Sequence, residues 1–164
     1  MTFVLGGARS GKSLYAEQIV AALPPPWVYI ATAQALDEEM RVRIRMHQER
    51  RGADWHTIEA PLDLADALRK AASRPALVDC LTLWLTNLML GGHDVAVATH
   101  SLDHALDART TPTVLVANEL GMGIVPDNAL ARAFRNEAGR LNQRIAARAE
   151  AVLLMVAGLA MKVK

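Results

Sequence analysis

The sequence predicts a three-layer α/β fold with a mainly parallel central sheet. Short apolar, strand-like runs alternate with helix-like segments along the chain, which is the pattern of a parallel sheet covered by helices on both faces. A glycine-rich stretch joins the first apolar run to the first helix-like segment. We find no linker, internal repeat or low-complexity tract, so residues 1–164 are expected to form a single domain.

Proline residues and hydrophobic periodicity mark the elements of the first half of the chain. Three consecutive prolines, residues 24–26, end the first helix because proline cannot continue a helix. Leu36, Met40 and Ile44 recur every four residues, which predicts an amphipathic helix. Pro61 is expected in the first turn of the helix that follows. In chain order we expect a strand over 2–5, a helix over 12–23, a strand over 27–32, a helix over 36–51, an extended piece over 55–60 and a helix over 62–72.

The second half of the chain ends in the longest predicted helix and a final strand. Either Asp127 or Asn128 supplies the N-cap of this helix, which follows a glycine-rich loop. Apolar residues expected near one of its faces are Leu130, Phe134, Leu141 and Ile145. In chain order we expect a strand over 75–81, helices over 81–90 and 95–108, a strand over 112–119, a helix over 129–149, a strand over 151–158 and a short edge strand over 159–164.

The composition narrows the class of protein. The 164 residues are 52% hydrophobic and 21% charged, as in a globular domain, and the net charge of +1 argues against a protein built to neutralise nucleic acid. Cys80 is the only cysteine, which excludes an internal disulfide and a multi-cysteine zinc site. No signal peptide and no run of about 20 apolar residues is found. We therefore expect a cytoplasmic protein without a membrane span or a nucleic-acid partner.

The glycine-rich stretch matches the phosphate-binding loop pattern G-x-x-x-x-G-K-[ST], the P-loop, at every fixed position. Its glycines let backbone N–H groups surround phosphate oxygens, and the helix that follows adds its positive dipole end. Lys12 is expected to reach the outer phosphates. An ordinary glycine-rich turn is the alternative interpretation. The predicted phosphate-binding residues, which make the expected fold P-loop NTPase-like, are Gly6, Gly7, Ala8, Arg9, Ser10, Gly11, Lys12 and Ser13.

A P-loop that uses Mg²⁺ needs an acidic side chain beside the hydroxyl of Ser13. Asp79 is the preferred candidate because it ends the apolar run at residues 75–81. Glu119 ends the run at 112–119 and competes for the same role, and both carboxylates could line one crevice. A helix-capping carboxylate or an ordinary loop carboxylate is the alternative interpretation of Asp79.

Two histidine groups could carry chemistry. His100 and His104 are spaced i,i+4 and could bind a metal, but a solvated helix face is preferred because no further ligand set is evident. His47 lies in a segment dense in arginine, where neighbouring cations favour a neutral, nucleophilic imidazole. From spacing alone, a charged surface helix that carries one histidine is again the preferred interpretation.

Three segments together resemble one family. They are GGARSGKS at residues 6–13, YIATAQALDEEMRVRIRMHQERR at 29–51 and VANELGMGIVPDNALARAFRNEAGRLNQR at 116–144. The most specific parts are Arg43, Ile44 and His47 at their mutual spacing, and NELGMG at 118–123. On these residues the chain resembles the bifunctional adenosylcobinamide kinase / adenosylcobinamide-phosphate guanylyltransferase family of cobalamin biosynthesis. The resemblance extends from Phe3 to the terminal MKVK.

The resemblance implies two reactions on a corrinoid. A nucleoside triphosphate, GTP or ATP, gives its γ-phosphate to a hydroxyl on the aminopropanol arm of adenosylcobinamide. GTP then gives GMP to that phosphate through a covalent link to a histidine, and the matching residue here is His47. The resemblance thus makes His47 the expected nucleophile, with Lys12 as its catalytic partner and Mg²⁺ as the cofactor.

The resemblance also implies a wider nucleotide site. Besides the P-loop, the matching positions are Ala31, Thr32, Ala33, Gln48, Glu49, Arg50, Arg51, Glu59 and Asp79. The chain departs from the family pattern in four places. Ala33 replaces a serine common in relatives, Met46 replaces a histidine that some relatives carry, and Asp79 stands where some members have glutamate. The segment 91–111 is short against some relatives. Members of the family form trimers with active sites near subunit contacts. The resemblance therefore implies a homo-oligomer. The apolar segment 81–90 could contact a neighbouring subunit or, as is commoner, the core.

Two other functions compete with this one. A small-molecule P-loop kinase would need Lys12, Ser13 and Asp79 but no covalent chemistry at His47. A GTP-dependent switch would be expected to carry an asparagine–lysine–x–aspartate element that reads guanine, and the sequence has none.

Overall fold

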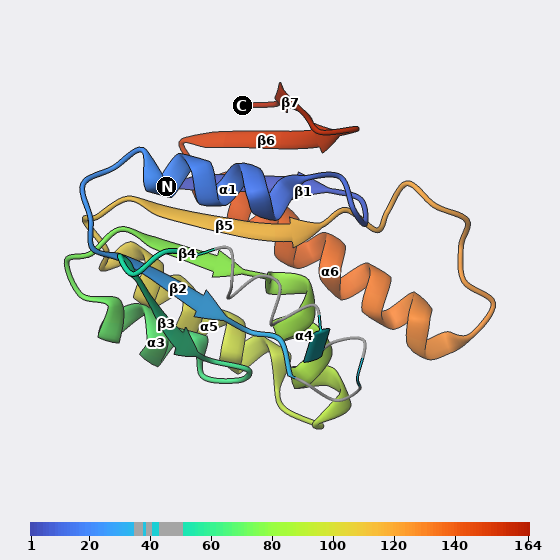
Figure 1. The fold of residues 1–164 in the computed structure, drawn as a ribbon. Coiled ribbons are helices and arrows are strands. Elements are labelled where there is room, and N and C mark those ends of the chain that lie inside the picture. The colour runs from blue at the N-terminus through green and yellow to red at the C-terminus, as the bar shows by residue number, and fades with distance from the viewer. Residues whose placement is uncertain (35–37, 39–40, 43–50) are drawn as a thin grey trace.

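The computed structural model describes residues 1–34, 38, 41, 42 and 51–164. Over these residues the chain forms a seven-stranded sheet in the order β3-β2-β4-β5-β1-β6-β7, in which β7 alone runs antiparallel to its neighbour (Figure 1). The prediction of an α/β fold with a mainly parallel sheet is therefore confirmed. The strands are β1 (Thr2–Gly6), β2 (Trp27–Ala31), β3 (Trp55–Glu59), β4 (Ala76–Asp79), β5 (Thr113–Asn118), β6 (Ala151–Val156) and β7 (Leu159–Lys162).

Helices cover both faces of this sheet. One face packs against α1, whose Ala16 and Val20 are buried with Val4 and Val116 of the strands. The other face packs against the remaining helices around a larger core that includes Trp84. The helices are α1 (Lys12–Ala21), α3 (Leu64–Ala71), α4 (Leu81–Leu90), α5 (Val95–Asp107) and α6 (Ala129–Arg148). None of the helices in the described part of the chain is long and apolar enough to cross a membrane.

Capping side chains explain most helix starts. The Asn128 side chain accepts a hydrogen bond from the Ala131 N–H at 2.8 Å, so Asn128 rather than Asp127 caps α6. Asp63 accepts from the Asp66 N–H at 2.9 Å and caps α3. The expectation that Pro61 stands in the first turn of α3 is therefore wrong, because this cap delays the helix start until Leu64.

The apolar residues of the longest helix separate into two groups. Leu141 and Ile145 are buried against the sheet, and Phe134 packs against the same core. Leu130 is 60% exposed, contrary to the expected apolar face. The reason is geometric, because the first turns of α6 extend beyond the carboxyl edge of the sheet (Figure 1).

The apolar segment of α4 packs in the core. Leu81, Trp84 and Leu85 are almost fully buried, and the Trp84 Nε1–H donates to the Leu62 carbonyl at 2.7 Å. This confirms the commoner of the two interpretations of that segment. The predicted helix over residues 36–51 falls mostly outside the described residues.

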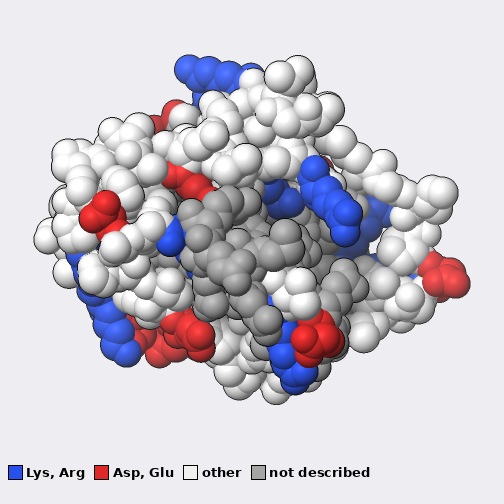
Figure 2. Space-filling view, viewed as in Figure 1, with Lys and Arg blue, Asp and Glu red and all other residues white. Residues whose placement is uncertain are grey.

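Parallel pairing brings the carboxyl ends of six strands, β1 to β6, to one edge of the sheet. Gly6 of β1 pairs with Asn118 of β5, and Ala31 of β2 pairs with both Asp79 of β4 and Glu59 of β3. Residues that are far apart in the sequence thereby meet at this edge, where open α/β sheets bind their ligands. On the face drawn in Figure 2, outside the grey residues, acidic and basic side chains are interspersed rather than gathered into one basic stripe.

Candidate nucleotide-binding site

The P-loop connects β1 to α1, between strand and helix as the motif predicts. The backbone takes left-handed φ angles at Arg9 (55°) and Gly11 (91°). Gly6 must be glycine, because a Cβ there would lie 2.4 Å from Ser10 Oγ and 2.9 Å from the Met155 carbonyl oxygen. The loop therefore turns tightly from the strand into the helix and presents its backbone at the carboxyl edge.

Two polar side chains of the P-loop are withdrawn from solvent. Lys12 is 6% exposed, and its Nζ donates to the Gly7 carbonyl at 3.0 Å across the loop. Ser10 Oγ is buried without a hydrogen-bond partner among the described residues. A buried hydroxyl without a partner is costly, and a phosphate oxygen in the loop would satisfy it. Gly7, Ala8 and Arg9 are exposed at the mouth of the loop.

The turn between β6 and β7 supports the P-loop from the side. The Gly158 N–H donates to the Ser10 carbonyl at 3.0 Å. Gly158 also takes a left-handed φ of 82°, which a glycine adopts without strain. The sequence offered no sign of this contact, since 148 positions separate the two residues along the chain.

The two candidate metal ligands occupy different places relative to the P-loop. The strand order puts β5 between β1 and β4, so Asp79 lies one strand further from the P-loop than Glu119. The Glu119 N–H donates to the Gly6 carbonyl at 3.1 Å, while its carboxylate accepts a hydrogen bond from the Gly121 N–H. Asp79 is half-buried at the end of β4. Both carboxylates thus reach the carboxyl edge, and hard oxygen donors of this kind suit Mg²⁺.

Tyr29 links Asp79 to Arg51. The Tyr29 hydroxyl donates to Asp79 Oδ2 at 3.0 Å, and the Arg51 guanidinium lies 3.5 Å from the centre of the Tyr29 ring. Burial, followed by the charge of Asp79, raises the pKa of Tyr29 well above its ordinary value. The phenol therefore keeps its proton and remains a donor to the carboxylate.

Arg51 brings a positive charge to this end of the sheet. Its Nη1 is buried and has no hydrogen-bond partner among the described residues. A phosphate or carboxylate oxygen would suit this atom as a hydrogen-bond acceptor. Arg51 is thus the one residue of the predicted 48–51 segment that the structure places, while His47, Gln48, Glu49 and Arg50 lie outside the described residues.

Side-chain hydrogen bonds from Thr32 and Asn87 hold together the segments that follow β2, β3 and β4. The Thr32 hydroxyl donates to the Cys80 carbonyl and accepts from the Cys80 N–H, both at 2.8 Å. The Asn87 side-chain amide donates to the Thr32 carbonyl at 2.8 Å and to the Pro61 carbonyl at 2.9 Å. Sequence reasoning missed Asn87. The signal that could have found it is a single asparagine within an apolar helical run.

The remaining predicted residues of the carboxyl edge lie around these hydrogen bonds of Thr32 and Asn87. Ala31 and Ala33 are half-buried on either side of Thr32, and Glu59 is exposed at the end of the edge strand β3. Burial, followed by the charge of Asp79, raises the pKa of the Cys80 thiol to about 11. The prediction that Cys80 is a core residue and not a nucleophile is consistent with this environment.

The histidines of α5 lie away from this edge. His100 and His104 are exposed, and their Nε2 atoms lie 3.0 Å apart. In the described part of the chain, no group of three or more histidine, cysteine, aspartate or glutamate side chains could hold a metal ion. Asp103 is buried and engaged by Arg144 and Arg148. The preferred interpretation, a solvated helix face, fits these contacts.

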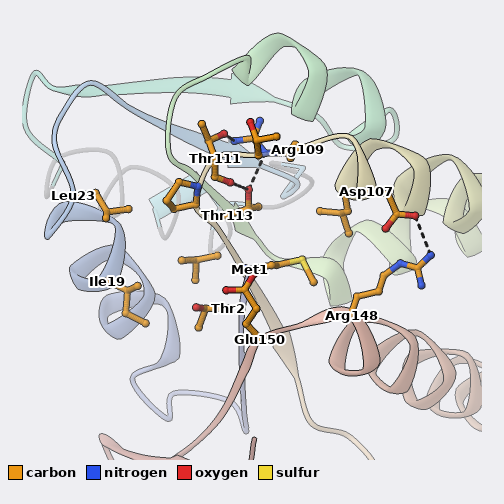
Figure 3. A pocket seen from close by; sticks show the side chains of 14 residues that line it. Met1, Thr2, Ile19, Leu23, Asp107, Arg109, Thr111, Thr113, Arg148 and Glu150 are labelled. Atoms are coloured by element: carbon orange, nitrogen blue, oxygen red, sulfur yellow. Dashed lines mark hydrogen bonds and ion pairs between the residues drawn. The ribbon is translucent and has the colours of Figure 1, made fainter.

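A cavity of about 470 Å³ opens at the opposite, amino edge of the sheet (Figure 3). Arg109 lies in its wall, and its guanidinium is fully engaged. It donates to the carbonyls of Leu68 (2.9 Å), Ala72 (3.1 Å) and Arg74 (2.8 Å) and to the hydroxyls of Thr111 (2.9 Å) and Thr113 (2.8 Å). These bonds join the end of α3 to the start of β5. The role of Arg109 is therefore structural.

Comparisons with known proteins agree on one family. Residues 2–163 match the family model described as cobinamide kinase / cobinamide phosphate guanyltransferase. The chain is 48% identical over 165 residues to the bifunctional adenosylcobalamin biosynthesis protein CobP of Pseudomonas aeruginosa, covering 98% of this chain and 95% of the relative. It is 43% identical over 181 residues to the bifunctional adenosylcobalamin biosynthesis protein CobU of Salmonella typhimurium, covering 100% of this chain and 99% of the relative.

The fold is also similar to that of a solved P-loop enzyme. An ATPase from the type III secretion system of pathogenic bacteria superposes with a TM-score of 0.55 at 10% identity. The superposition covers 98% of this chain and 56% of the ATPase chain. At this identity the likeness concerns the fold alone.

Proposed function

Because the chain belongs to the cobinamide kinase / cobinamide phosphate guanyltransferase family, we propose that it phosphorylates adenosylcobinamide and then transfers GMP from GTP to the new phosphate. The observation that carries this proposal is the full-length family match, together with a P-loop at the carboxyl edge of the sheet. The enzyme would act in the cytoplasm, in adenosylcobalamin biosynthesis, and would form a homo-oligomer such as a trimer.

The P-loop would hold the triphosphate in both reactions. Backbone N–H groups of residues 7–13 and the Lys12 ammonium would neutralise phosphate charge as the leaving group departs. The Ser13 hydroxyl and the Asp79 carboxylate, with Glu119 as the competing ligand, would hold Mg²⁺. When bound, Mg²⁺ would supply a further positive charge to the phosphates. Ser10 Oγ and Arg51 Nη1, both buried without a partner among the described residues, are available to phosphate oxygens.

His47 would carry the guanylyl group. A neutral imidazole nitrogen would attack the α-phosphorus of GTP, forming a P–N bond while the bond to the bridging oxygen breaks and pyrophosphate leaves. An oxygen of adenosylcobinamide phosphate would then attack the same phosphorus and break the P–N bond. This route divides one difficult transfer into two steps. The role of His47 rests on the family resemblance at Arg43, Ile44 and His47.

The proposal is tested by incubating the protein with Mg²⁺ and GTP labelled at the α-phosphate. We expect protein-bound label that is lost in acid and retained in base, as for a phosphoramidate, and no label in His47→Ala. His56→Ala is the matched control, because His56 is an exposed histidine on β3, and it should label normally. Label that persists in His47→Ala would contradict the covalent role.

Product analysis separates the proposal from its main rival. The wild-type protein with adenosylcobinamide, GTP and Mg²⁺ should yield the GDP-linked corrinoid. A small-molecule kinase without histidine chemistry would stop at the phosphorylated corrinoid, and that result would overturn the second reaction while keeping the first.

A further inference from the structure

The loop between β5 and α6, together with the first turn of α6, exposes an unusual concentration of apolar side chains. Met122 is 80% exposed, Ile124 97%, Val125 63% and Leu130 60%. We refer to these four residues as the loop patch. Single exposed apolar residues are ordinary, but a group within nine positions of one segment marks a binding surface. In Figure 2 the lobe at the right, where Figure 1 places this loop, carries mainly uncharged side chains.

The segment that carries the loop patch leaves the sheet beside the P-loop. β5 is the direct neighbour of β1, with Asn118 paired to Gly6, and the Glu119 N–H donates to the Gly6 carbonyl at 3.1 Å. Leu120 then packs against the core. The segment therefore leaves the sheet next to the phosphate-binding residues and extends outward from them (Figure 1).

Two arginines of α6 hold the backbone of this loop. Arg135 donates to the carbonyls of Gly121 and Gly123, the second at 3.2 Å. Arg132 donates to the carbonyls of Pro126 at 3.1 Å and of Asp127 at 2.6 Å. Charged donors to several carbonyls order a loop that has little buried side-chain surface of its own. The apolar side chains are thus presented to solvent by a supported backbone.

We propose that the loop patch seats the corrin macrocycle of cobinamide while its arm places the reacting hydroxyl at the P-loop. This inference rests on the proposed function. The substrate consists of a large macrocycle with apolar faces and a short arm that ends in the hydroxyl, so the macrocycle must lie within an arm's length of the γ-phosphate. The loop patch is an apolar surface on the segment that leaves the sheet beside the P-loop, and burial of apolar area contributes to the binding of such a ring.

The test compares serine variants at the two ends of the molecule. Val125→Ser and Val163→Ser make the same change at nearly equal exposure, 63% and 65%. Val163 is the control, because its N–H bonds to the Val152 carbonyl near the start of β6, at the edge opposite the P-loop. Ile124→Ser removes the most exposed member of the loop patch. Binding of adenosylcobinamide is measured by equilibrium dialysis through its visible absorbance, together with KM for each substrate and the oligomeric state by light scattering.

We expect Ile124→Ser to raise the Kd and the KM for adenosylcobinamide about tenfold and Val125→Ser about threefold, as lost burial of one aliphatic side chain implies. Val163→Ser should change neither. KM for GTP and labelling by GTP alone should stay unchanged, since the P-loop is intact. An unchanged Kd in both loop variants would overturn the proposal, as would a wild type that does not bind the corrinoid.

The oligomeric state decides between the substrate and a second copy of the chain. Dissociation of an oligomer in Ile124→Ser would show that the loop patch contacts another subunit and would overturn the proposal. The proposed function fails in a different way, when wild-type protein binds the corrinoid and transfers no phosphate to it. In that case the dialysis result still decides the role of the loop patch.

Discussion

At the scale of single residues, the site depends on polar groups that hold other polar groups in place. The Tyr29 hydroxyl orients Asp79 at 3.0 Å, and the Tyr29 ring supports Arg51. Tyr29 thereby connects a candidate metal ligand to the end of the arginine-rich segment that carries His47. Partners of this kind tune a metal ligand without touching the metal, and their loss typically reduces affinity or activity by about 10- to 100-fold.

Replacement of Tyr29 by phenylalanine tests this connection. Tyr29→Phe keeps the ring under Arg51 but removes the donor to Asp79. We expect the Mg²⁺ concentration needed for half-maximal labelling by GTP to rise about tenfold. The free energy of unfolding should fall by about 1 kcal/mol, the value of one hydrogen bond. A Mg²⁺ titration of the labelling rate and a denaturant melt measure the two effects.

Tyr15 provides the control, because it is the other tyrosine of the chain and lies on α1. Tyr15→Phe should leave the Mg²⁺ dependence unchanged. Equal effects in the two variants, or a loss of stability in Tyr29→Phe without any change in Mg²⁺ dependence, would mean that Tyr29 only packs.

At the scale of elements, side chains that bond to carbonyls join the ends of helices and strands. Asn87 of α4 bonds to the segments after β2 and β3, and Arg132 and Arg135 of α6 bond to the loop after β5. Arg109 does the same at the amino edge, between α3 and β5. Most of the carbonyls that accept these bonds lie in connecting segments, where no helix or sheet partner is available to them.

Arg109→Met tests how much one such side chain contributes. The variant removes five hydrogen bonds and leaves carbonyls at the cavity wall without their donor. We expect a loss of about 3 kcal/mol in the free energy of unfolding. For a chain of this size that lowers Tm by roughly 6–12 °C, measurable by calorimetry.

Arg69→Met is the matched control for this stability measurement. Arg69 is 62% exposed on α3 and pairs with Asp66 at the surface. Its loss should cost less than about 0.5 kcal/mol. The structural role of Arg109 is contradicted if the two variants melt at the same temperature, or if Arg109→Met loses nucleotide labelling while keeping wild-type stability.

At the scale of the whole molecule, strand order decides which groups share the site. β5 stands between β1 and β4, so the segment after β5 adjoins the P-loop and the residues after β4 and β2 lie beyond it. All of them meet at the carboxyl edge, whereas the cavity with Arg109 opens at the other end of the sheet. A ligand at the carboxyl edge therefore contacts several elements at once and should stabilise the fold as a unit.

Stabilisation by GTP measures this coupling. With GTP and Mg²⁺ at about 100 times the dissociation constant, the folded state gains about 2.7 kcal/mol. Tm should then rise by roughly 5–10 °C in the wild type. Lys12→Ala should lose most of this shift, since the buried ammonium would face the phosphates. Lys162→Ala, at an exposed position on β7, should keep it. A full shift in Lys12→Ala would show that the nucleotide binds without the P-loop lysine.

Most element positions could be predicted from the sequence because their causes are local. Prolines, caps and apolar periodicity act within a few residues, and the predicted strands and helices of the described part lie within a few residues of the observed ones. Where a prediction was wrong, the local sequence allowed two interpretations, and only packing could decide between them. Pro61 and Asp63 both fit a helix start, and Leu130 fits the apolar pattern of a helix whose first turns have no sheet beneath them.

The sequence by itself determined the chemistry of the phosphate loop, the type of fold and the family, because each resides in short contiguous motifs. The tertiary structure decided which groups surround that loop. The bond from Tyr29 to Asp79 spans 50 positions, and the bond from Asn87 to Thr32 spans 55. Such contacts depend on which strands become neighbours in the sheet, and neighbours are chosen by the packing of the whole core rather than by any local pattern.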